Sequence, residues 1–125
     1  MTVDIIPHSN TEIYSVGQLN QESRLLLEQN FANIWIQGEL SSISQPSSGH
    51  VYFTLKDDHA QVRCAMFRMN RRKVTFALEQ GKQVLAFAKV SLYEPRGDFQ
   101  LIISHLEEAG QGLLQRQFEQ LKKKL

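Results

Sequence analysis

Residues 90–104, "VSLYEPRGDFQLIIS", place two apolar runs on either side of a tight turn. Pro95 presets φ for the second position of a β-turn, and Gly97 tolerates a positive φ. The four residues from Pro95 to Asp98 therefore predict a hairpin between two strands. Arg96 would stand at its tip in solvent, either as an ordinary surface residue or as a cation that meets an anion.

Alternation of apolar and polar residues with a period of two predicts five strands in all. Their sequences are "NIWIQGELSSIS" (33–44), "HVYFTLK" (50–56), "QVRCAMF" (61–67), "QVLAFAKVSLY" (83–93) and "FQLIIS" (99–104). Gly38 indicates a bulge or sharp bend, so the first strand should be long and curved. In the third strand we expect an inward set, Val62, Cys64 and Met66, and an outward set, Gln61, Arg63, Ala65 and Phe67.

Helical patterns precede, interrupt and follow these strands. Ser15 and Gln18 form a capping box that predicts a helix over about 16–29, which should bury a stripe of Val16, Leu19 and Leu26. The connection "RMNRRKVTFALEQG" (68–81) predicts a short helix closed by Gly81. A last amphipathic pattern has Leu114, Phe118, Leu121 and Leu125 at helical spacing. It stops without a cap, so we expect a fragment of a longer chain.

Five strands with a helical connection between the third and fourth match the OB-fold. We therefore expect a mainly β, five-stranded Greek-key OB-fold barrel at 13–109, which includes the N-terminal helix. A flexible leader at 1–12 and a helix at 110–125 that leads out of the domain complete the expected organisation. The 125 residues suffice for one domain of this kind.

Charge and cysteine content narrow the functional classes. The net charge is only +1, yet residues 59–78 contain no acid and hold Arg63, Arg68, Arg71, Arg72 and Lys73. A single cysteine excludes an internal disulfide. No apolar run approaches the length of a membrane span, and no leader for secretion is evident. We expect a cytoplasmic protein with no membrane partner.

Catalytic, metal and cofactor sites are not indicated by the sequence. The four histidines are scattered, and one cysteine cannot build a zinc cluster. The pair Asp57 and Asp58 is more typical of turn chemistry than of cation binding. Neither a nucleophile elbow nor a glycine-rich phosphate loop is present. We expect no catalytic residue, no metal and no cofactor within this chain.

A binding surface is the remaining possibility. Tyr52, Lys56, Arg63 and Phe67 would lie outward on the second and third strands, where OB-folds bind oligonucleotides with the loops between strands one and two and between strands four and five. Aromatic rings stack on bases while cations follow the phosphates. Structural alternatives are open: the rings can serve β-propensity, Arg63 can pair with Glu39, and Trp35 can be a core anchor under the first helix.

Three long blocks carry a family resemblance. They read "YSVGQLNQESRLLLEQNFANIWIQGELSSISQPSSGHVYFTLKDDHAQVRCAMFR", "LYEPRGDFQLII" and "GLLQRQFEQLKKKL". Over about residues 13–125 the chain resembles the amino-terminal segment of the exodeoxyribonuclease VII large-subunit family. "SGHVYFTLKD" and "LYEPRGDFQL" are the most specific parts.

The resemblance implies an OB-fold that holds single-stranded DNA for a nuclease domain whose catalytic residues lie beyond Leu125. The family enzyme degrades single-stranded DNA from both ends into oligonucleotides, and many copies of a small subunit accompany its large subunit. Carried over by position, the DNA-contacting residues would be Ser48, Gly49, His50, Tyr52, Lys56, Arg63, Phe67, Arg68, Arg71, Arg72 and Arg96.

Two other functions compete with single-stranded DNA binding. An RNA-binding OB-fold, such as the anticodon-binding domains of tRNA synthetases, shares the strand plan and reads bases and 2′-hydroxyls. A protein-interaction module would dock a partner on the first helix or on the last amphipathic stripe.

Overall fold

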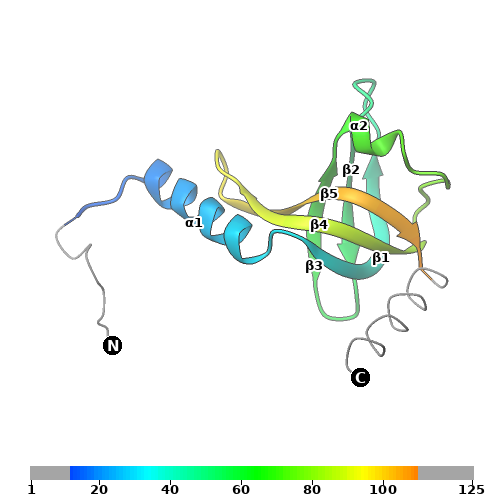
Figure 1. Ribbon diagram of the computed structural model, residues 1–125, viewed down its shortest axis with the longest axis horizontal. Coiled ribbons are helices and arrows are strands. Elements are labelled where there is room, and N and C mark those ends of the chain that lie inside the picture. Colours follow the sequence, from blue (N-terminus) through cyan, green and yellow to red (C-terminus); the bar gives the residue numbers. More distant parts are fainter. Residues whose placement is uncertain (1–11, 110–125) are drawn as a thin grey trace.

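The computed structural model describes residues 12–109, which form a five-stranded barrel with one long helix outside it (Figure 1). The elements are α1 (Val16–Asn30), β1 (Ile34–Ser44), β2 (Val51–Lys56), β3 (Gln61–Met66), α2 (Arg68–Arg71), β4 (Gln83–Tyr93) and β5 (Asp98–Glu108). The barrel closes in the order β1-β2-β3-β5-β4, with β3 and β5 parallel and the other pairs antiparallel. This order confirms the predicted fold class.

Two predicted segments lie outside the residues that the structure describes. They are the leader, apart from Glu12, and the helix at 110–125 with Leu114, Phe118, Leu121 and Leu125. The boundaries assigned to these segments remain predictions.

Side chains that point inward from all five strands fill the barrel. Leu40, Val51, Val84 and Ile103 are fully buried, each at 0% exposure. Burying an aliphatic side chain of this size contributes about 1.5–3 kcal/mol. Cys64 and Met66 lie inside as predicted, but Ala65 is also buried. Ala65 points outward as predicted, but it is covered there because this small side chain lies between Tyr52 and Ile102 on the adjoining strands.

Strand β1 is long and serves both halves of the barrel. Its first half pairs with β4 and its second half with β2. The irregularity lies between Ser41 and Ser44, where Ser42 has a φ of 51°, and not at Gly38 as predicted. A Cβ at Gly38 would lie 3.3 Å from the Cβ of Leu55, so this glycine allows a close approach of β1 to β2.

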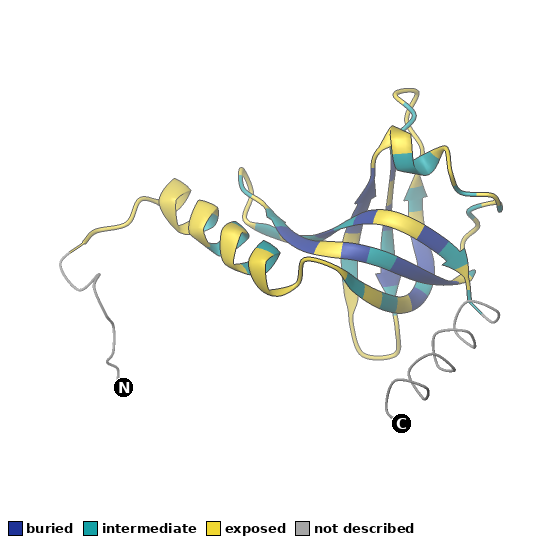
Figure 2. Cartoon of the chain, viewed as in Figure 1, coloured by how far each residue is buried: buried dark blue, intermediate teal, exposed yellow. Residues whose placement is uncertain are grey.

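Helix α1 begins as predicted but packs with the opposite face. Ser15 and Gln18 form the expected capping box. The predicted burial of Val16, Leu19 and Leu26 is wrong: Val16 is 76% exposed, and no residue of α1 is fully buried (Figure 2).

A mainly polar face of α1, which also contains Leu27, lies against β4 and the turn that follows it. Arg24 forms ion pairs with Glu28 and Glu94, and the Ser91 hydroxyl donates to Glu28 across 2.7 Å. The Asn20 amide donates to the backbone carbonyl of Glu94 at 2.9 Å. These contacts fix the orientation of the helix and leave its apolar stripe facing outward.

The remaining boundaries differ from the prediction by more than one residue in two places. The short helix α2 ends at Arg71, so Gly81 is not its stop; Gly81 has a φ of 86° in the turn before β4. Strand β5 extends to Glu108, beyond the predicted end at residue 104, because its second half pairs with β4. The turn between β4 and β5 is as predicted, with Gly97 at a φ of 69°.

Candidate nucleic-acid interface

Three aromatic rings gather where the β1–β2 loop meets the end of β3. The ring of His50 lies edge-on to Phe67 at 5.4 Å and to Tyr52 at 6.5 Å, measured between ring centroids. Tyr52 and Phe67 are 42% and 44% exposed, so a flat ligand can reach them. We call His50, Tyr52 and Phe67 the ring cluster.

The ring cluster is joined to a basic segment by a hydrogen bond. The backbone N–H of Arg68 donates to Nδ1 of His50 at 2.9 Å, which places the proton of a neutral imidazole on Nε2. This bond caps the start of α2, because Phe67, its N-cap residue, supplies no side-chain cap. The ring cluster and the arginines of α2 are therefore held together.

The basic segment, residues 68–72, lies against the β1–β2 loop. A Cβ at Gly49, whose φ is 92°, would lie 2.8 Å from Cδ of Arg68. Arg71 donates to the side chain of Gln45 at 3.1 Å, and the Ser48 hydroxyl accepts a hydrogen bond from the backbone of His50 at 3.4 Å. We call the three arginines of this segment the basic rim: Arg68, Arg71 and Arg72.

A second basic group forms at the β4–β5 turn. Arg63 of β3 donates to Oδ2 of Asp98 at 3.3 Å, and Nε of Arg96 at the tip of the turn forms an ion pair with the same oxygen at 3.4 Å. Arg63 is adjacent to the turn because β3 pairs with β5 and places Arg63 opposite Gln100. We call Arg63 and Arg96, held by Asp98, the arginine fork.

The ring cluster and the arginine fork lie on one outer face of the barrel. Tyr52 is opposite Ala65, and Arg63 precedes Ala65 by two residues on β3. Side chains in this diagonal relation on neighbouring strands are about 7–8 Å apart. The face therefore offers stackable rings between two groups of cations, which is the combination that single-strand binders use.

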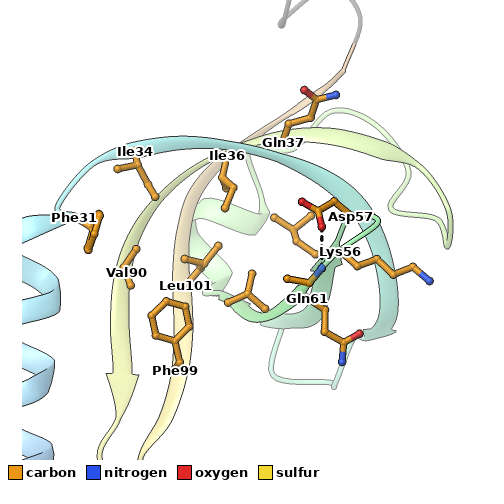
Figure 3. Close-up of a pocket in the computed structure, with 13 residues that line it drawn as sticks. Phe31, Ile34, Ile36, Gln37, Lys56, Asp57, Gln61, Val90, Phe99 and Leu101 are labelled. Carbon is orange, nitrogen blue, oxygen red and sulfur yellow. Dashed lines mark hydrogen bonds between the residues drawn. The ribbon is translucent and has the colours of Figure 1, made fainter.

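Lys56 lies on the same outward face of β2 as Tyr52, at the end of the strand away from the ring cluster. It pairs with Glu39 at 4.0 Å and borders an apolar cavity of about 380 Å³ (Figure 3). The cavity is lined mainly by side chains such as Ile34, Val90 and Leu101, and the side chain of Lys56 extends away from them. Lys56 is opposite Gln61, and Arg63 follows Gln61 by two residues on β3, so Lys56 stands in the same diagonal relation to Arg63 as Tyr52 does. Its place in the interface stays a prediction.

The structure also decides between alternatives left open by the sequence. Arg63 pairs with Asp98 and not with Glu39. Trp35 is 37% exposed and lies on the outer face beside Phe87, 4.9 Å away between centroids, so it is not a core anchor. The carboxylate of Asp57 accepts hydrogen bonds from the backbone of His59 and Ala60 at 2.8 and 2.9 Å, which is turn chemistry.

Residues 12–109 contain no group of three or more metal-ligating side chains. Burial raises the pKa of the Cys64 thiol to about 12, which keeps it protonated and unreactive. Neither helix within these residues has the length and apolarity needed to span a bilayer.

Sequence reasoning missed Asp98 as a member of the interface. It was interpreted only as the last residue of a turn, although the turn itself was recognised. The parallel pairing of β3 with β5 brings Arg63 to Asp98, and residues 35 positions apart give no local signal of that pairing.

Comparison with known proteins gives a consistent result. A family model described as an OB-fold nucleic acid binding domain matches residues 14–107. The chain is 57% identical over 121 residues to the exodeoxyribonuclease 7 large subunit of Enterobacter sp. strain 638, and 56% identical to that of Klebsiella pneumoniae strain 342. Each match covers 97% of this chain and 26% of the relative, so the chain spans about a quarter of their length.

A solved structure supports the fold alone. Its title describes a replication protein A heterotrimer bound to ssDNA, and it aligns with a TM-score of 0.50 at 9% identity. The alignment covers 62% of this chain and 57% of that one.

Proposed function

Because the chain belongs to the family of OB-fold nucleic acid binding domains, we propose that it binds single-stranded DNA on the outer face of β2 and β3. The observation that carries this proposal is the position of the ring cluster between the basic rim and the arginine fork. Bases of a single strand would stack on Tyr52 and Phe67, at about 1–3 kcal/mol per base. Phosphates would meet the arginines on either side.

The contacting residues are proposed from this geometry and from the family resemblance. They are Ser48, Gly49, His50, Tyr52, Arg63, Phe67, Arg68, Arg71, Arg72 and Arg96. Lys56 is proposed with them, because it lies on the same outward face and diagonal to Arg63.

In a longer protein, this domain would hold substrate for an exodeoxyribonuclease. The names of the relatives support that role, and the small subunit of such an enzyme would contact regions outside the residues described. Hydrolysis of single-stranded DNA from both ends would then depend on residues beyond Leu125. We propose no catalytic role for the chain itself.

A second candidate function, docking of a partner protein on α1, is favoured by one observation. The apolar stripe of α1 faces outward, with Leu19 and Leu26 54% and 60% exposed. This function and DNA binding use different surfaces, so a Leu19→Glu, Leu26→Glu variant should bind single-stranded DNA as the wild type does.

The proposal is tested with fluorescein-labelled DNA and RNA oligonucleotides of the same sequence. We expect a Tyr52→Ala, Phe67→Ala variant to lose at least about tenfold in DNA affinity, because stacking on two rings is removed. DNA should bind at least as well as RNA. A clear preference for RNA would favour an RNA-binding OB-fold, and unchanged affinity in the variant would remove stacking from the account.

A further inference from the structure

The arginine fork presents two guanidinium groups to one oxygen atom. Nη1 of Arg63 and Nε of Arg96 lie 3.3 and 3.4 Å from Oδ2 of Asp98. The arginine side chains are 69% and 70% exposed, whereas that of Asp98 is 34% exposed. Each guanidinium has five N–H donors, so most donors of the fork face solvent.

The carboxylate of Asp98 has the features of a backbone phosphate. A carboxylate and a phosphodiester both carry one negative charge on two oxygens, and both accept hydrogen bonds from arginine forks. Another acid of the same turn, Glu94, is bound to Arg24 of α1. Asp98 is thus the carboxylate that faces the two arginines among the described residues.

We propose that the arginine fork is a subsite for one DNA phosphate, and that Asp98 occupies it when no DNA is bound. Exposed ion pairs are weak, so a phosphate can displace the carboxylate without disturbing the fold. The displaced Asp98 remains close to the phosphate and repels it. Asp98 therefore lowers affinity at this end of the strand and keeps the two arginines together until DNA arrives. The subsite rests on the proposed function, because it is one part of the proposed path of the strand.

The backbone supports a fixed position for this subsite. Arg96 is in a four-residue turn whose N–H groups at Arg96 and Gly97 donate to the carbonyl of Tyr93 at 3.2 and 2.8 Å. Asn20 and Arg24 of α1 hold Glu94 at the start of the same turn. Arg63 is anchored in β3 by its pairing with β2 and β5. Both elements that supply the arginines, the turn and β3, are thus held by backbone hydrogen bonds before any ligand binds.

The experiment measures the affinity of an Asp98→Asn variant for 5′-fluorescein oligo(dT) by anisotropy at about 0.1 M salt. Asparagine keeps the shape of the side chain and removes its charge. We expect about fourfold tighter binding, which corresponds to the repulsion of two unit charges about 5 Å apart in water. Asp58→Asn is the matched control, because it removes the same charge in the turn between β2 and β3. Screening over a Debye length of about 10 Å should keep its effect below about 1.5-fold.

A second pair of variants tests whether the gain in affinity from Asp98→Asn depends on the arginine fork. In an Arg63→Ala, Arg96→Ala background, the gain from Asp98→Asn should fall below about 1.5-fold, because the subsite has been removed. A gain that persists there, or an equal gain in Asp58→Asn, would overturn the subsite. Weaker binding by Asp98→Asn would also overturn it, since Asp98 would then position the arginines rather than compete with DNA. If wild-type protein binds no oligo(dT), the proposed function fails together with the subsite; the other contrary outcomes reject the subsite alone.

Discussion

Replacing Gly49 by alanine tests the contact between the β1–β2 loop and the basic rim. Gly49 has a φ of 92°, and a Cβ there would lie 2.8 and 2.9 Å from Cδ and Cγ of Arg68. A side chain in this backbone region costs about 1–2 kcal/mol, and the close contact must be relieved by moving the flexible stem of Arg68. We therefore expect the free energy of unfolding to fall by about 1–2 kcal/mol. In a domain of this size, that lowers the melting temperature by about 4–8 °C per kcal/mol.

The same substitution should weaken DNA binding, because Arg68 can no longer lie along the loop. Loss of one phosphate contact should lower the salt dependence of binding by about 0.7 in the slope of log affinity against log salt. Gly81→Ala is the matched control: Gly81 has a φ of 86°, but nothing lies within 4 Å of its Cβ position. It should lose a similar amount of stability by thermal circular dichroism and keep full affinity by anisotropy. Wild-type affinity in Gly49→Ala would refute the placement of Arg68 at the interface.

Three further results are expected. Arg63→Ala should lower the slope of log affinity against log salt by about 0.7, whereas Tyr52→Ala should weaken binding and leave that slope unchanged. Anisotropy titrations at several salt concentrations measure both slopes. Equal slopes in the two variants would contradict the assignment of Arg63 to a phosphate and of Tyr52 to a base. The hydrogen bond from Ser91 lowers the pKa of Glu28, so the stability that its ionised form contributes is present above a pH of about 4.3 and is lost as the pH falls through its lowered pKa. The stability difference between wild type and Glu28→Gln, measured by urea unfolding, should therefore shrink below about pH 4, and a difference that is constant with pH would count against this linkage. Cys64, with its pKa raised to about 12 by burial, should not react with a thiol reagent at pH 8 until the protein is unfolded, and rapid labelling of the folded protein would show that the strand opens.

Local patterns were sufficient for the strands and for the turn that contains Arg96. The predicted fourth strand, 83–93, has the observed bounds of β4, and Gly97 has the positive φ expected of it. Period-two alternation succeeds here because inward residues of a closed barrel are buried whatever their partners are.

The face of α1 could not be read from its periodicity. The apolar stripe of Val16, Leu19 and Leu26 predicted burial, but the ion pair of Arg24 with Glu94 and the hydrogen bond from Ser91 to Glu28 hold the polar face against the barrel. Those contacts join residues that are 63 and 70 positions apart, so no local window contains them.

Only part of the interface was predicted, because some of its contacts also join residues that are far apart in the sequence. Sequence reasoning named His50, Tyr52 and Phe67, and the structure brings their rings together. It also named Lys56, which shares the outward face of β2 with Tyr52 and lies diagonal to Arg63 on β3. Asp98 was missed because its role depends on the pairing of β3 with β5.

The most direct test of the central claim compares single-stranded and double-stranded DNA of the same sequence. A duplex hides the faces of its bases, so Tyr52 and Phe67 have nothing to stack on, although its phosphates remain available to the arginines. The wild-type domain should bind a labelled single strand at least about tenfold more tightly than the matched duplex at about 0.1 M salt, as measured by anisotropy, and Tyr52→Ala should narrow that ratio. Equal affinity for the two forms would contradict the account and leave a basic surface that binds any polyanion.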